Sequence, residues 1–180
     1  MGNRTAIQEP PGGGTVGYQY DALNRLVRFT DQLGNATTST YDPAGNRTAI
    51  INPLGHPTTF AYDARNRLER ITQPDPDGPG ELTSSITTYV YDGVGNRTAV
   101  IDPLSRRTTY AYDPANRLTT MTDARGGQTL FRYDNADRLE SLTDPVNNRT
   151  TWTYDRAGRV STEMDPRNIG PRTRMTRRTS

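Results

Sequence analysis

Tyrosine, aspartate and arginine recur together along this chain, and all three are residue types that could do chemistry. Rows of carboxylates could mimic the paired acids of glycosidases, and rows of aromatic rings could stack on sugars. Catalysis, however, needs one differentiated site in which distinct environments push the pKa values of two groups apart. Seven near-identical copies offer no such site. The pairs are Tyr20 and Asp21, Tyr41 and Asp42, Tyr62 and Asp63, Tyr91 and Asp92, Tyr112 and Asp113, Tyr133 and Asp134, and Tyr154 and Asp155.

We therefore predict that these Tyr and Asp residues are structural and define the repeat, and that they are not catalytic. Aspartate side chains commonly cap turns, and a carboxylate accepts strong hydrogen bonds from a guanidinium group. An arginine so held can also lie over the face of a tyrosine ring. Contact between the aromatic rows and a glycan is the alternative function for the same columns.

The other candidate sites are weaker. Gly12-x-Gly14-x-x-Gly17 has the spacing of a dinucleotide-binding loop, but it lacks the preceding strand and following helix that such a loop needs, so a hairpin loop is expected. His56 is the only histidine and lies in a predicted turn without a partner at fixed spacing, which argues against a triad or a histidine-ligated metal. Asp75 and Asp77 could bind calcium only weakly, because no calcium-loop pattern surrounds them.

Asn-x-Thr sequons also recur, and they recur because the repeat does. We interpret them as structural rather than as glycosylation sites. No cofactor and no metal ion is expected. The sequons begin at Asn3, Asn35, Asn46, Asn96 and Asn148.

The elements that position these residues follow from the period. Successive Tyr-Asp pairs are 21, 21, 29, 21, 21 and 21 residues apart, and the long interval contains a Pro- and Gly-rich insertion near residues 73–80. A fixed period in this range indicates a repeat architecture. A loop can lengthen without disturbing a ladder of strands, so the insertion is compatible with continued pairing.

Each period is predicted to be strand, turn, strand, turn. The first strand ends at the tyrosine and carries a second aromatic residue two positions earlier in six of seven copies, which puts both rings on one face. Turns such as 43–45 and 52–55 contain the Gly, Asn, Asp and Pro residues of tight hairpins or of type I or II turns. The position two before the tyrosine is Tyr18, Ser39, Phe60, Tyr89, Tyr110, Phe131 or Trp152, and the position nine after it is Phe29, Ile50, Ile71, Val100, Met121, Leu142 or Glu163.

The predicted fold class is all-β, with tandem antiparallel hairpins in one long curling sheet. No apolar stripe of helical period lasts two turns, and Gly or Pro interrupts about every ten residues. Rows of aromatic side chains, each stacked on its equivalent one repeat away, are expected to stabilise the sheet. One repeat alone cannot bury its face, whereas several stacked repeats can.

The Tyr-Asp-x-x-(Gly)-Asn-Arg core, with its trailing Asp-Pro-Leu-Gly, resembles the RHS/YD repeat. The resemblance covers about residues 2–168 in seven in-register copies. Known members are large bacterial polymorphic toxins, insecticidal toxin-complex subunits and wall-associated proteins, with teneurins as animal relatives. The resemblance implies a segment of a spiral shell that encloses a toxic polypeptide from the same protein. This sequence shows no C-terminal autoprotease core, no separate toxin domain and no export domain, so it corresponds to shell wall alone.

Composition narrows the remaining function classes. Hydrophobic residues make up 31% of the chain, too few for a thick two-layer core, and the absence of cysteine excludes disulfides and thiolate metal sites. All 22 basic residues are arginine, and four of them lie after residue 168, where there is no acid. Residues 1–168 carry 18 Arg against 20 Asp plus Glu, a net charge of −2, so no nucleic-acid partner is expected. No apolar run is long enough for a membrane span.

Both ends are expected to be truncated. Residues 1–7 match residues 94–100, which puts Met1 at an ordinary repeat position. The period holds through 1–168 and stops in the Arg-rich segment 169–180. A shifted reading frame of that segment permits Arg-Thr-Thr-Tyr-Ala-Tyr-Asp-Ala-Ala-Asn, close to residues 107–116. The hypothesis is a frameshift near Asn168 followed by a disordered tail.

The resemblance thus implies a non-enzymatic shell segment of a secreted or surface-displayed bacterial protein, whose partner is a toxin polypeptide of the same protein. The alternative is a cell-surface module that binds carbohydrate or wall material. The faces that the aromatic residues occupy, together with saturable glycan binding, discriminate between the two.

Overall fold

The fold was examined in a computed structural model, which describes residues 6–8, 15–75, 84–166 and 172–173. The elements within these ranges are β-strands, and strand order in the sheet follows chain order from β1 to β16, so each strand pairs with its neighbours in sequence. None of the described residues belongs to a helix that could span a membrane. The all-β prediction is confirmed.

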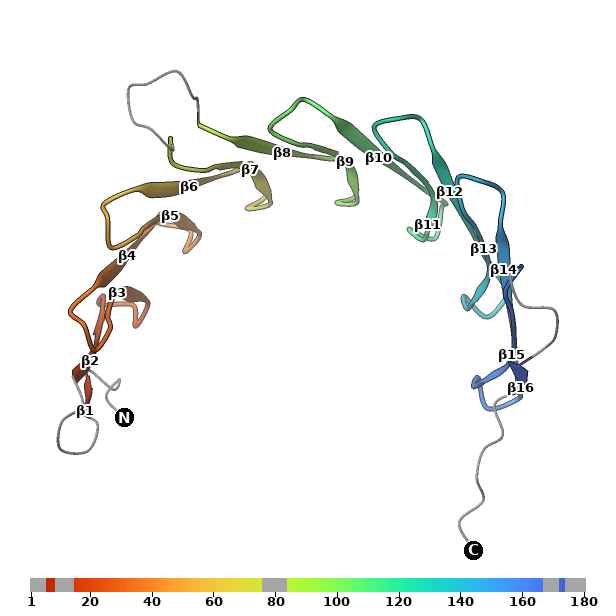
Figure 1. The fold of residues 1–180 in the computed structure, drawn as a ribbon, viewed down its shortest axis with the longest axis horizontal. Coiled ribbons are helices and arrows are strands. Elements are labelled where there is room, and N and C mark those ends of the chain that lie inside the picture. The colour runs from red at the N-terminus through yellow and green to blue at the C-terminus, as the bar shows by residue number, and fades with distance from the viewer. Residues whose placement is uncertain (1–5, 9–14, 76–83, 167–171, 174–180) are drawn as a thin grey trace, which may run out of the picture. The chain divides into compact units, whose positions relative to one another are not determined.

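The strands alternate between six and five residues wherever a full repeat is described. The six-residue strands end at the repeat tyrosine, and the five-residue strands return from the turn that follows it (Figure 1). Their bounds are β1 Ala6–Gln8, β2 Thr15–Tyr20, β3 Leu26–Thr30, β4 Ala36–Tyr41, β5 Arg47–Ile51, β6 Pro57–Tyr62, β7 Leu68–Thr72, β8 Ile86–Tyr91, β9 Arg97–Ile101, β10 Arg107–Tyr112, β11 Leu118–Thr122, β12 Gln128–Tyr133, β13 Leu139–Thr143, β14 Arg149–Tyr154, β15 Val160–Met164 and β16 Arg172–Thr173.

The chain divides into two compact units, residues 1–89 and 90–180, and the boundary falls within β8. In the first unit, β1 to β7 and the beginning of β8 form an antiparallel ladder. In the second unit, β9 to β16 pair in the same way. Each unit therefore repeats one local pattern, with turns at both ends of its strands.

Cross-strand register pairs two columns of the repeat. The residue two before the tyrosine lies opposite the residue nine after it, as in Tyr18 with Phe29 and Phe131 with Leu142. Such directly opposed side chains are the unit of sheet stabilisation. Glu163, the polar residue at the position nine after the tyrosine, keeps the same pairing and lies opposite Trp152.

Neither unit has a conventional core. Among the described residues, Ala99 is the only buried hydrophobic residue, and the other buried residues are Thr129 and Ser141. The aromatic residues of the repeat are half-buried. Stability must therefore come from the ladder and from contacts between neighbouring repeats rather than from a second layer.

The insertion leaves the ladder intact. Gln73 donates its backbone N–H to the carbonyl oxygen of Ser85 at 2.8 Å, and β7 and β8 pair from Arg70 with Thr88 to Thr72 with Ile86. Residues 76–83 lie outside the described ranges, as does Asp77. Of the Arg-rich tail, the structure describes Arg172–Thr173, which pairs with Thr162 and Glu163. The domain boundary at residue 168 and the disorder of the tail remain predictions.

Candidate functional site

The most regular site in the molecule is the turn that follows each repeat tyrosine. Asp134 is representative: its N–H donates to the carbonyl oxygen of Arg138, its own carbonyl oxygen accepts from the N–H of Asp137, and Asp137 has a φ of 61°. Positive φ at the fourth residue, with none at the third, identifies a type I turn followed by a left-handed residue. The same geometry occurs in the turns at the other ends of the strands at 31–35, 52–56, 102–106, 123–127 and 144–148, so these second turns are type I rather than type II.

The aspartate side chain closes this turn. Oδ1 of Asp134 accepts hydrogen bonds from the N–H groups of Ala136 and Arg138, at 2.8 and 3.0 Å, and Oδ2 accepts from Nε of Arg138 at 2.7 Å. The Arg138 side chain, followed by its amide, lowers the pKa of Asp134 below the usual 3.8. The predicted capping role is thus what the aspartates perform. Hydrogen bonds from the fifth turn residue, an arginine or an asparagine, also lower the pKa at Asp21, Asp42, Asp63, Asp92, Asp113 and Asp155.

A β-bulge accompanies the turn, and sequence reasoning missed it. In the hairpin of β12 and β13, Arg132 lies opposite Ser141 while Tyr133 lies opposite Leu139, so Glu140 is left over on the returning strand. The same shift occurs beside Tyr20, Tyr41, Tyr62, Tyr112 and Tyr154. A bulge disrupts the ladder locally and leaves backbone groups that need other partners.

The tyrosine of the following repeat supplies such a partner. The hydroxyl group of Tyr154 donates to the carbonyl oxygen of Leu139, the first residue of bulged strand β13, at 2.8 Å. Each bond spans 15 residues and so joins one repeat to the previous one. The equivalent bonds run from Tyr41 to Leu26, Tyr62 to Arg47, Tyr112 to Arg97 and Tyr133 to Leu118, at 2.9 to 3.1 Å.

Arginine completes this connection. Cζ of Arg138, which is paired with Asp134, lies 4.5 Å from the ring centroid of Tyr154 in the next repeat. Arg25 lies over Tyr41 at 4.6 Å and Arg117 over Tyr133 at 4.9 Å. We call this Asp–Arg pair and the tyrosine of the next repeat the inter-repeat joint.

Repeats with Gly-Asn-Arg use a second form of the joint. Nδ2 of Asn46 donates to Oδ2 of Asp42 at 3.0 Å and to Oδ1 of Asn66, in the next turn, at 2.8 Å. Asn96 bonds Asp92 and Asn116 in the same way. The arginine, moved one position along, lies over the other aromatic column: Arg47 over Phe60 at 5.5 Å and Arg97 over Tyr110 at 5.2 Å.

The predicted rows of stacked aromatic rings differ from what the structure shows. The contact that recurs between repeats joins a guanidinium group to a ring. One ring pair, Tyr18 with Phe29, joins adjacent strands with centroids 5.4 Å apart. Guanidinium groups suit this position because one face can lie on a ring while the N–H groups hold a carboxylate.

The sequon asparagines have the structural role that was expected of them. Nδ2 donates to Oδ2 of the aspartate four residues earlier at Asn35, Asn46, Asn96 and Asn148. Asn3 lies outside the described ranges. So do Gly12 and Gly14 of the glycine pattern, while Gly17 belongs to β2.

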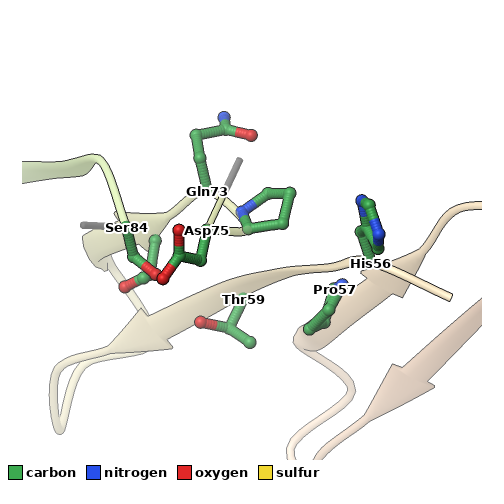
Figure 2. Close-up of a pocket in the computed structure, with 8 residues that line it drawn as sticks. His56, Pro57, Thr59, Gln73, Asp75 and Ser84 are labelled. Atoms are coloured by element: carbon green, nitrogen blue, oxygen red, sulfur yellow. The ribbon is translucent and has the colours of Figure 1, made fainter. Parts of the chain in front are cut away.

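His56 lies in a turn, as predicted, and lines a hollow of about 330 Å³ beside the insertion. In Figure 2, His56 and Pro57 lie at one side of this hollow and Gln73, Asp75 and Ser84 at the other. Thr59 lies between them, and the hydroxyl group of neighbouring Thr58 donates to Oε1 of Gln73 at 3.2 Å. No group of three or more His, Asp or Glu side chains in the described part of the chain could hold a metal ion.

Comparison with known families matches the pattern described as RHS Repeat to residues 20–57, 41–78, 91–128 and 133–167. The chain belongs to the RHS repeat family. Curated proteins contain no match to it.

Solved structures agree in fold. The RHS chain resembles a chain of the Photorhabdus luminescens Tc holotoxin pore with a TM-score of 0.67 and 18% identity, over 88% of this chain and 9% of that one. TcdB2-TccC3 without its hypervariable C-terminal region matches with the same values. A TcdB2-TccC3-Cdc42 structure matches with a TM-score of 0.56 and 18% identity, over 87% of this chain and 11% of that one. The chain thus spans about a tenth of the length of these proteins.

Proposed function

We propose that this RHS chain is a wall segment of a shell that encloses a toxin polypeptide belonging to the same full-length protein, and that it has no catalytic activity of its own. The observation that carries the proposal is the inter-repeat joint. In it, the recurring aspartate, arginine and tyrosine side chains bond the backbone and one another across neighbouring repeats, as in Asp134, Arg138 and Tyr154.

A sheet built in this way can extend by whole repeats without acquiring a thick core. Such a structure suits a wall, because each added repeat brings its own turn caps and its own bonds to the previous repeat. The fold likeness to TcdB2-TccC3 supports the proposal, since those structures include forms with and without a hypervariable C-terminal region. Secretion or display on the bacterial surface is part of the same proposal.

The direct test is protease protection in the full-length protein that contains this array. Native protein should keep an enclosed polypeptide intact under a protease concentration that degrades the same polypeptide expressed alone. Mild denaturant that opens the array should expose the polypeptide to cleavage. Equal cleavage of the polypeptide inside and outside the protein would overturn the proposal.

A second function, binding of a surface carbohydrate, is favoured by one observation. The aromatic rings of the repeat are half-buried rather than buried, among them Phe60, Tyr110 and Trp152, so part of each ring is available to a sugar face. Saturable binding to a panel of wall and cell-surface glycans, lost in Trp152→Ala and Tyr110→Ala, would support it. Absence of binding across the panel would remove this alternative.

A further inference from the structure

We draw no further inference here: the strongest candidate, the surface patches of exposed Leu and Val side chains at the turns that precede the six-residue strands (Leu33, Leu54, Leu104 and Val146), carries nothing because nothing in the structure shows what covers these apolar turn tips.

Discussion

The turns at the two ends of the strands share one backbone geometry but differ in what their side chains contact. We call the turns that follow the repeat tyrosines the Tyr-Asp side; they lie at residues 21–25, 42–46, 63–67, 92–96, 113–117, 134–138 and 155–159. We call the turns at the other end the Pro-Leu side; they lie at residues 31–35, 52–56, 102–106, 123–127 and 144–148. On both sides the side chain of an aspartate or asparagine accepts hydrogen bonds from the N–H groups of the third and fifth turn residues. On the Tyr-Asp side the paired arginine also reaches the tyrosine of the next repeat and is 25 to 35% exposed at Arg25, Arg117 and Arg138. On the Pro-Leu side, Arg106 pairs with Asp102 and remains 63% exposed.

This difference shows that the turn residues have two separate structural roles, which cannot be told apart in the sequence pattern. The cap closes a hairpin, whereas the tyrosine and the guanidinium join one hairpin to the next. The one insertion in the array falls on the Pro-Leu side, where the turn carries no tyrosine joint. Loop length is therefore free to vary there, because neighbouring repeats are joined from the other side.

The largest effect is expected from removing one tyrosine of the joint. Tyr133→Ala loses the ring, its contact with Arg117 and the hydroxyl bond to Leu118. The free energy of unfolding should fall by about 3 kcal/mol in urea denaturation. Val146→Ala on the Pro-Leu side is the control and should change it by less than about 0.5 kcal/mol. Equal losses from the two substitutions would contradict the difference between the sides.

Acid should weaken the joints next. The pKa of each Tyr-Asp side aspartate is lowered in the folded chain, at Asp134 chiefly by the Arg138 side chain. A lowered folded pKa contributes stability above the unfolded value of 3.8, and this stability is lost as the pH falls through the folded value. Thermal unfolding midpoints should therefore be flat between about pH 6 and 8 and fall from about pH 5 downward.

The control for this acid limb is Asp113→Asn with Asp134→Asn. This variant should be less stable at neutral pH and lose less stability on acidification, because two of the groups that take up protons on unfolding are gone. An acid limb as steep as that of the native chain would count against the assignment.

A smaller effect isolates the tyrosine hydroxyl. Tyr133→Phe keeps the ring under Arg117 but removes the bond to the Leu118 carbonyl oxygen at the bulge, and should cost about 1 kcal/mol in urea denaturation. Tyr110→Phe is matched to it, because the Tyr110 hydroxyl group makes no hydrogen bond within the described part of the chain. It should be nearly neutral, and a loss equal to that of Tyr133→Phe would show that the bulge carbonyl is not the reason for tyrosine.

The smallest effect is expected from lengthening a turn of the Pro-Leu side. Four Gly or Ser residues inserted after Leu104 should lower stability by about 1 kcal/mol, the order of loop-closure entropy. The same insertion after Ala136 displaces Arg138 from Tyr154 and should cost clearly more. Thermal unfolding measures the two losses of stability. Equal losses at the two positions would contradict the prediction that contacts on the Tyr-Asp side hold neighbouring repeats together.

Local features of this architecture could be predicted from the sequence. The 21-residue period, the two strands of each repeat and the capping role of Asp134 all follow from spacing and residue type. The bulge beside Tyr133 could not be predicted in this way, because an extra residue in a ladder leaves no compositional mark. The carbonyl oxygen that accepts from the Tyr133 hydroxyl group belongs to Leu118, 15 residues away in another repeat. Only the register of the folded strands brings the two groups together.

The predicted stacking of rings on rings illustrates the same limit. Spacing shows that Tyr133 and Tyr154 are equivalent, but it does not show that Arg138, held by Asp134, lies over the later ring. The hollow at His56 likewise depends on how β6 begins and β7 ends beside the insertion. In each case the missing information is the side-chain direction across repeats.

Native-state hydrogen exchange of two backbone amides tests the central claim most directly. The N–H groups of Arg138 and Asn148 donate to Oδ1 of Asp134 and Asp144 in the same turn geometry, at 3.0 and 2.8 Å. If joints on the Tyr-Asp side hold the repeats together, the Arg138 amide should exchange at least about tenfold more slowly, because its turn opens only when a joint opens. Equal exchange at the two amides would show that the local cap alone sets the stability of each turn and would contradict the account.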